Sequence, residues 1–160
     1  KYPIHELTIH PRIQTDMYRG VPRLGAYEKA VNRLQMPLCY NGNLFSIADY
    51  KRITQRFPDA DCFMYGRGLI TNPGLVSEIR DGAQPGKAVL RQFQDCLLEE
   101  YKELLSGERN VLFRMKELWS YMAVSFTNYE KYAKKIKKSQ HLSDYQAAVS
   151  SLFAEQDLVD

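Results

Sequence analysis

Short apolar runs alternate with segments of helical spacing through the first half of the chain, and this alternation limits the fold more than any other feature. The runs predict three strands, at Glu6–His10, Pro37–Tyr40 and Cys62–Tyr65. Helical spacing lies between them at 24–34 and again from the N-cap Ser46 to Phe57, where Pro58 ends the helix. Continuous apolar strands separated by helices indicate a parallel sheet that is covered on both faces.

Three strands are too few to stand alone as such a sheet. The spacing along the chain from one strand end to the next is typical of a TIM barrel of parallel strands. We therefore expect the last three βα units of a (β/α)8 barrel, completed by an N-terminal portion or by another chain that covers the open sheet edge.

The second and third strands each run into a glycine-containing turn. These turns are Asn41-Gly42-Asn43 and Gly66-Arg67-Gly68. Exposed backbone N–H groups next to an arginine form a phosphate cradle, and the loops after the last two strands of such a barrel often hold phosphate. The alternatives are that Asn-Gly forms an ordinary turn and that Arg67 is solvated. A cofactor that carries phosphate is the first functional hypothesis.

The second half of the chain is predicted to be helical. The composition changes at 81–86, so we expect a partial barrel over residues 1–82 and a helical domain over residues 83–160. Helices are expected at 87–105, 111–126, 128–138 and in a last segment through Phe153, where Ser143 and Gln146 form a capping box. Short connections between these helices predict a small antiparallel bundle.

Two of these helices have apolar stripes that predict the core of the bundle. The first stripe is Val89, Leu90, Phe93, Leu97, Tyr101 and Leu104; the second is Leu112, Met115, Leu118, Trp119, Met122 and Phe126. The second stripe favours core packing over a platform for stacking bases. The chain's 11 tyrosines suit stacking on an extruded base and packing equally well.

Composition excludes several other classes of protein. No apolar stretch approaches the roughly 20 residues that cross a bilayer, and the N-terminus has no signal core, so we expect no membrane and a cytoplasmic location. The widely spaced Cys39, Cys62 and Cys96 are expected to be buried thiols in a reducing compartment. The sequence contains no CxxC motif and no His/Cys cluster of the kind that indicates a metal site. The absence of an initiator Met suggests that the chain starts inside a longer gene product.

Several motifs occur in an order that is specific when they are taken together. They are Leu7–Arg12, Tyr18-Arg19-Gly20, Pro37–Asn43, Phe63–Pro73 and, in the helical half, 114–121. Their order resembles the C-terminal part of the tRNA-dihydrouridine synthases, over nearly the whole chain. The first, third and fourth are similar to the sixth, seventh and eighth barrel strands of this family, and the last resembles a helix of its RNA-binding domain.

The resemblance implies an FMN-binding TIM barrel followed by a helical tRNA-binding domain. It implies reduction of the C5–C6 double bond of a tRNA uridine, with FMN as cofactor and NAD(P)H as electron donor. The positions that match the family's cofactor contacts are His10, Asn41, Gly42, Asn43, Gly66, Arg67 and Gly68. For His10, a structural role at the barrel mouth is the alternative.

The sequence departs from the family pattern at two positions, and it lacks several parts of that pattern. Pro11 replaces the usual glycine and removes one N–H, and Asn43 replaces an acidic residue. The family's first five strands and its proton-donating cysteine are missing, and no cysteine here lies in the matching motif. We therefore expect a C-terminal fragment that is inactive alone and contains no catalytic residue.

Basic residues provide the expected contacts with tRNA. The resemblance and the charge pattern point to Arg12, Arg114, Lys116, Lys131, Lys134 and Lys135. The alternatives are a solvated face for the lysine run and an ion pair at the barrel mouth for Arg12. Two other functions stay open: a flavin barrel acting on a small molecule, like a dihydropyrimidine or dihydroorotate dehydrogenase, and an isolated RNA-binding module. The basic bundle argues against the first.

Overall fold

The computed structural model describes residues 3–17, 19–60 and 62–159. The chain divides into two compact units, Lys1–Gly68 and Leu69–Asp160. This division lies before the composition change at residue 82, because Ile70 packs against the helical core and Ser125 Oγ donates a hydrogen bond to the Thr71 carbonyl at 2.8 Å. The assignment of residues 1–82 and 83–160 to two functional domains stays a prediction.

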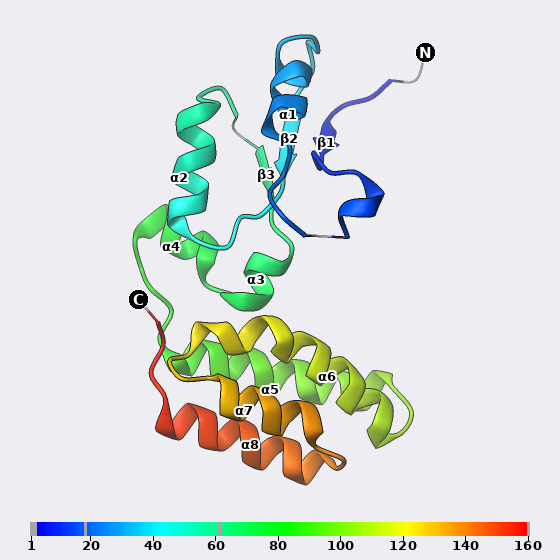
Figure 1. The fold of residues 1–160 in the computed structure, drawn as a ribbon, viewed down its shortest axis with the longest axis vertical. Helices are drawn as coiled ribbons and strands as arrows, with labels where there is room; N and C mark the ends of the chain where they lie inside the picture. Colours follow the sequence, from blue (N-terminus) through cyan, green and yellow to red (C-terminus); the bar gives the residue numbers. More distant parts are fainter. Residues whose placement is uncertain (1–2, 18, 61, 160) are drawn as a thin grey trace. The chain divides into compact units, whose positions relative to one another are not determined.

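A three-stranded parallel sheet forms the centre of the first unit (Figure 1). Its strands are β1 (Leu7–Ile9), β2 (Leu38–Asn41) and β3 (Cys62–Met64), in the order β1-β2-β3. Ile9 pairs with Tyr40, and Tyr40 pairs with Phe63. The predicted strands and their parallel direction are confirmed, and the full barrel stays a prediction.

The connections between the strands contain η1 (Gln14–Asp16), α1 (Leu24–Val31) and α2 (Ile47–Arg56). Helix α2 begins where predicted, because Ser46 Oγ accepts the Asp49 N–H at 3.1 Å. It ends at Phe57, directly before Pro58. The local signals of the sequence therefore set both ends of this helix.

One face of the sheet packs against α1 and α2. The core of this unit consists of Tyr27, Tyr40, Leu44, Ile53 and Phe57. The ring of Tyr27 meets those of Tyr40 and Phe57 edge-on, with centroids 5.0 Å apart in each case. Burial in this core raises the pKa of Tyr40 to about 12.

The opposite face of the sheet contains Cys39 and Cys62, because strand side chains alternate. The Cys62 thiol contacts the Glu6 carboxylate at 3.4 Å. Hydrogen bonding with Cys39, burial and this contact raise the pKa of Cys62 to about 12. The prediction of three buried thiols holds for Cys39 only: Cys62 is partly exposed, and Cys96 lies at the surface because its position on α5 faces solvent.

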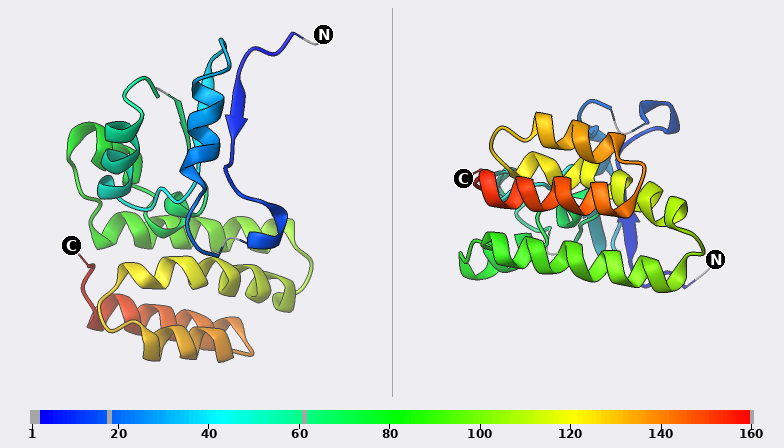
Figure 2. Two further views of the ribbon diagram at one scale, coloured as in Figure 1. Left: turned by 45° about the horizontal axis from the view of Figure 1, so that its top comes forward. Right: turned by 90° about the horizontal axis from the view of Figure 1, so that it is seen from below.

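The second unit is helical (Figures 1 and 2). Its elements are α3 (Arg67–Thr71, which begins in the first unit), α4 (Leu75–Asp81), α5 (Lys87–Leu104), α6 (Glu108–Met122), η2 (Ala123–Ser125), α7 (Glu130–Lys138) and α8 (Leu142–Glu155). Figure 2 shows α5 to α8 side by side, as the predicted bundle requires. None of the described helices is long and apolar enough to cross a membrane.

Three local predictions were wrong in whole or in part. Of the predicted α5 stripe, Leu90 is buried and Phe93, Leu97 and Tyr101 pack against the core, whereas Val89 and Leu104 are 45% and 73% exposed. The buried face also includes Leu98 and Gln94, a polar residue that the apolar pattern could not include.

The other two wrong predictions concern helix starts. No capping box forms at Ser143, because α8 begins at Leu142 and the Glu108 carboxylate accepts the Leu142 N–H. The segment Gly66-Arg67-Gly68 is not a free turn, since Arg67 is the first residue of α3.

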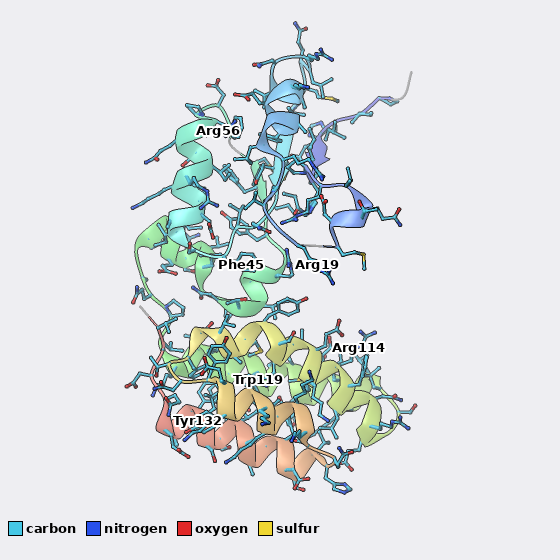
Figure 3. The ribbon with its side chains drawn as sticks, in the orientation of Figure 1. Arg19, Phe45, Arg56, Arg114, Trp119 and Tyr132 are labelled. Carbon is cyan, nitrogen blue, oxygen red and sulfur yellow. The ribbon has the colours of Figure 1, made fainter. Side chains whose placement is uncertain are left out.

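A chain of buried hydrogen bonds runs through the core of the bundle. Trp119 Nε1 donates to the Tyr145 hydroxyl at 2.7 Å, and that hydroxyl donates to Gln94 Oε1 at 2.5 Å. All three residues are at least 98% buried, and Figure 3 shows Trp119 within the bundle. The predicted packing of the α6 stripe is confirmed, and Gln94 is buried because it completes this chain.

We predict that Tyr145→Phe destabilises the bundle by about 3 kcal/mol, because Trp119 Nε1 and Gln94 Oε1 each lose their buried partner. Urea unfolding followed by tryptophan fluorescence measures the change. The control is Tyr101→Phe, at a residue that packs against the same core but takes no part in the hydrogen bonds of these three buried residues. It should lower the free energy of unfolding by less than about 1 kcal/mol. Equal losses for the two variants would contradict the role given to this chain.

Candidate functional site

The predicted cofactor residues gather at the carboxyl end of the parallel strands, within the Lys1–Gly68 unit. His10 and Asn41 directly follow the paired residues Ile9 and Tyr40. The structure joins them, with 2.8 Å between His10 Nδ1 and Asn41 Oδ1. The parallel register therefore brings together two side chains that are 31 positions apart in the sequence.

Asn43 is at the centre of the site. Its Oδ1 accepts hydrogen bonds from Arg12 Nη2 at 3.0 Å and from Arg67 Nη2 at 3.3 Å. Its backbone is in the left-handed region, with φ +41°, which asparagine tolerates better than most residues. Two guanidinium cations thus converge on one neutral amide oxygen.

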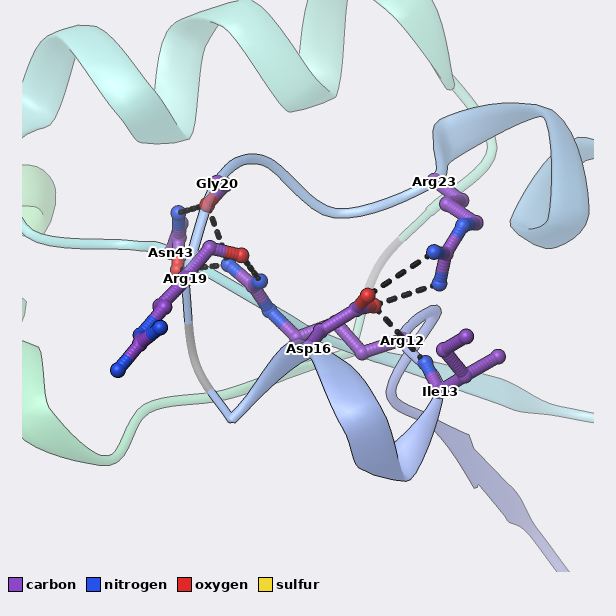
Figure 4. A network of polar contacts seen from close by, with 7 residues as sticks. All are labelled: Arg12, Ile13, Asp16, Arg19, Gly20, Arg23 and Asn43. Atoms are coloured by element: carbon purple, nitrogen blue, oxygen red, sulfur yellow. Dashed lines mark hydrogen bonds and ion pairs between the residues drawn. The ribbon is translucent and has the colours of Figure 1, made fainter.

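The position of Arg12 is fixed by carbonyl groups of the following loop. Its Nη1 donates to the Arg19 carbonyl at 2.5 Å and its Nη2 to the Gly20 carbonyl at 2.8 Å (Figure 4). Asn43 Nδ2 also donates to the Gly20 carbonyl, at 3.4 Å. Arg12 Nε is buried and has no hydrogen-bond partner among the described residues.

An ion pair holds the same loop. The Asp16 carboxylate accepts hydrogen bonds from Arg23 at 2.5 and 2.9 Å and from the Ile13 N–H at 3.0 Å (Figure 4). The Arg23 hydrogen bond, and then that of Ile13, lower the pKa of Asp16. The Arg23 N–H also donates to the Pro11 carbonyl, at 2.7 Å. The loop that presents the two carbonyls to Arg12 is thus fixed at both ends.

The surroundings of Arg67 and of the three predicted glycines differ from one another. Arg67 lies over the ring of Phe45, 5.3 Å from guanidinium carbon to centroid. A side chain at Gly42 would meet Pro22 and the Tyr40 hydroxyl at 3.0 Å, so these neighbours would have to shift by a few tenths of an ångström to admit it. Gly66 is exposed and has open space where a side chain would be, whereas Gly68 is buried in α3.

The two predicted RNA-contacting residues of α6 differ in how far they are exposed to solvent. Arg114 is exposed and pairs with Glu117 of the same helix at 3.0 Å (Figure 3). Lys116 is partly buried, and its Nζ donates to the Ser139 carbonyl just after α7. Lys116 thus joins two helices of the bundle, and Arg114 is the residue of this pair that faces solvent.

The lysines of α7 lie around Tyr132. Lys131 Nζ is 4.6 Å from the Tyr132 ring centroid and 3.6 Å from Glu155 Oε2. Lys135 Nζ is 6.0 Å from the same ring, and Lys134 is exposed. The Tyr132 hydroxyl donates to Glu155 at 2.5 Å, and this hydrogen bond is the main cause that lowers the pKa of Glu155. Lys131 is therefore partly neutralised, whereas Lys134 and Lys135 extend the basic surface.

Sequence reasoning missed several parts of the first site. Phe45 beneath Arg67 and the pair of Asp16 with Arg23 were not identified, because no local pattern distinguishes them from ordinary loop residues. Arg12 was assigned to RNA, and the structure brings it to Asn43 and Arg67. Tyr18, part of one predicted motif, lies outside the described residues.

Comparison with known proteins identifies the family of this chain. The family model described as dihydrouridine synthase (Dus) matches residues 3–159. The chain therefore belongs to the dihydrouridine synthase family.

Relatives named tRNA-dihydrouridine(16) synthase are similar over part of their length. The protein from Shewanella oneidensis is 30% identical over 119 residues, 73% of this chain and 37% of that protein. The one from Neisseria meningitidis serogroup B is 25% identical over 131 residues, covering 75% and 38%, and that from Aquipseudomonas alcaligenes is 23% identical over 101 residues, covering 61% and 32%. The chain thus matches 32–38% of the length of these relatives.

We predict that Asn43→Asp stabilises the Lys1–Gly68 unit by about 1 kcal/mol, because a carboxylate would neutralise the two guanidiniums. Hydrogen exchange of the unit's amides measures the change, and high salt should reduce it. The control Asn43→Ala removes the shared acceptor and strains the left-handed backbone, so it should destabilise the unit. Destabilisation of similar size by both variants would show that a carboxylate at position 43 gains no attraction to the two guanidiniums.

Proposed function

We propose that this chain is the C-terminal part of an FMN-dependent tRNA-dihydrouridine synthase that reduces uridine 16 of tRNA. Family membership supports the reaction class, and the names of the similar proteins support the position in tRNA. The observation that carries the cofactor assignment is the convergence of Arg12 and Arg67 on the neutral oxygen of Asn43.

The phosphate group of FMN fits the donors of this site. Two guanidiniums offer charge-assisted hydrogen bonds to phosphate oxygens, and Arg12 Nε is a buried donor without a partner among the described residues. Gly66 leaves open space beside Arg67, at the position where backbone N–H groups begin α3. We assign Arg12, Asn43, Gly66, Arg67 and Gly68 to the phosphate end of the cofactor.

The remaining predicted residues would contact the rest of the flavin or the base. His10 and Asn41 are coupled by their hydrogen bond, so Asn41 Oδ1 fixes which imidazole nitrogen faces the strand and which faces outward. Bound FMN, reduced by NAD(P)H, would supply the hydride for the uridine. The residues of this chain would hold the phosphate and orient the base.

The proton donor and the other barrel strands would come from outside these residues. The chain spans 32–38% of the length of the similar proteins, and among the described residues β1 and β3 each pair with one strand only. We propose that another segment or another chain completes the sheet, and that residues 1–160 alone do not reduce uridine.

The helical unit would bind tRNA in the cytoplasm. Lys134 and Lys135 lie on α7 near Lys131, and Arg114 is exposed on α6. Phosphate contacts by such residues give an affinity that falls as salt rises. Family membership favours tRNA over a small dihydropyrimidine or dihydroorotate as substrate.

We predict that Arg67→Ala, in the protein with its complete barrel, weakens FMN retention by about 10- to 100-fold and lowers uridine reduction. Flavin absorbance per protein after gel filtration and FMN titration measure retention. The control Arg33→Ala, an exposed arginine after α1, should keep full occupancy. Unchanged flavin occupancy in Arg67→Ala would refute the phosphate assignment. Residues 1–160 alone should retain much less than one equivalent of FMN.

We predict that the double variant Lys134→Glu with Lys135→Glu weakens tRNA binding and makes its salt dependence shallower by about two counterions. Filter binding at several salt concentrations measures both quantities. The control Lys29→Glu with Lys51→Glu makes the same change of net charge on exposed lysines of α1 and α2. If the two double variants lose affinity equally, the α7 lysines act only through net charge and are not a tRNA contact.

A further inference from the structure

We propose that Glu6, Cys39 and Cys62 form a binding site for one Zn²⁺ ion. The two thiol sulfurs and a carboxylate oxygen all lie within 4.8 Å of one another. This cluster is separate from the phosphate site, because it lies toward the amino ends of the strands. The proposal therefore does not depend on the assignment of the flavin.

The register of the parallel sheet brings these three residues together. Cys39 and Cys62 are directly paired on β2 and β3, so their side chains project from the same face. Thr8 pairs with Cys39, and Glu6 lies two residues before Thr8, which places it on that face as well. Strands β2 and β3 therefore each supply one thiol, and the residue just before β1 supplies a carboxylate, to the same side of the sheet.

The distances suit a tetrahedral ion. Zn²⁺ binds thiolate at about 2.3 Å and carboxylate at about 2.0–2.2 Å, so sulfur and oxygen on neighbouring corners are about 3.5 Å apart. The distance between Cys62 Sγ and Glu6 Oε2 is 3.4 Å. Two sulfurs on one Zn²⁺ are about 3.8 Å apart, which lies within the 4.8 Å limit of the cluster. Side-chain rotations alone would bring the three donors onto one ion.

The donor set selects the class of metal. Two sulfurs favour Zn²⁺ over Mg²⁺, Ca²⁺ and Mn²⁺, which prefer oxygen ligands. As each sulfur–zinc bond forms, the thiol releases its proton to solvent, so binding frees two protons and the oxidation state of both sulfurs is unchanged. Three protein ligands leave the fourth corner for water.

The bound ion would link β1, β2 and β3 through their side chains. The three strands are short, with three or four residues each, and their pairing gives few backbone hydrogen bonds. An ion that binds the folded sheet and not the unfolded chain stabilises the fold by mass action. Zn²⁺ would thus act as a clamp at the end of the sheet opposite the phosphate site.

The first test is titration of the reduced chain of residues 1–160 with Zn²⁺ against a chromophoric chelator. We expect one tight equivalent. Cys62→Ser should weaken binding at least about 10-fold, and Glu6→Gln, which keeps both thiols, should also weaken it about 10-fold or more. Cys96→Ser, which removes the exposed cysteine of α5, is the matched control and should bind as the unchanged chain does. Equal affinity of the Cys62→Ser and Cys96→Ser proteins would overturn the proposal.

The second test uses spectroscopy and alkylation, and it needs no substitution of the buried Cys39. With Co²⁺ in place of Zn²⁺, the unchanged chain and Cys96→Ser should show the charge-transfer and visible bands of tetrahedral thiolate–cobalt, and Cys62→Ser should lose them. Zn²⁺ should also slow alkylation of Cys62 by iodoacetamide at least about 10-fold and leave the rate at Cys96 unchanged. Absence of the cobalt bands, or equal protection of both cysteines, would show that no such site exists.

Discussion

The hydrogen bonds from two arginines to one asparagine oxygen join the loops at the carboxyl end of the sheet in the first unit. Like charges that share an acceptor repel each other, and an uncharged amide reduces that repulsion less than a carboxylate would. The arrangement persists because the Arg19 and Gly20 carbonyls, together with Asn43, surround the guanidinium of Arg12. The structure thus holds the two guanidiniums close together in advance, as the proposed phosphate site requires.

The parallel register determines which side chains gather at each end of the sheet. One face has nitrogen and oxygen donors at the carboxyl ends of the strands, from His10, Asn41 and the loops beyond them, and sulfur and carboxylate donors toward the amino ends. Because alternate residues share a face, a shift of one position would move Cys39 and Asn41 together to the side covered by helices. The packing of Tyr27 against Tyr40 fixes this register, so a core contact positions polar groups on the opposite face.

Local signals in the sequence predicted much of the fold, and contacts between distant residues account for the rest. Ser46 and Pro58 bound α2 through chemistry within a few residues, so that helix was predictable. The burial of Gln94 on α5 was not, because its Oε1 accepts a hydrogen bond from a hydroxyl on α8. The start of α8 depends in the same way on Glu108, from another helix. Of the candidate site, the strand ends were predictable, whereas the pairing of Arg12 with Arg67 through Asn43 required the loop conformation.

The basic surface of α7 shows why a count of charges overstates what a helix offers to nucleic acid. Five lysines fall between 131 and 138, yet Lys131 contacts both the Tyr132 ring and the Glu155 carboxylate. The Tyr132 hydrogen bond keeps Glu155 ionised by lowering its pKa, so this local neutralisation persists over a wider range of pH. Lys131 forms an ion pair with Glu155, so the lysines of α7 are not equivalent along the helix. The proposed tRNA contact would depend on this asymmetry as well as on the number of lysines.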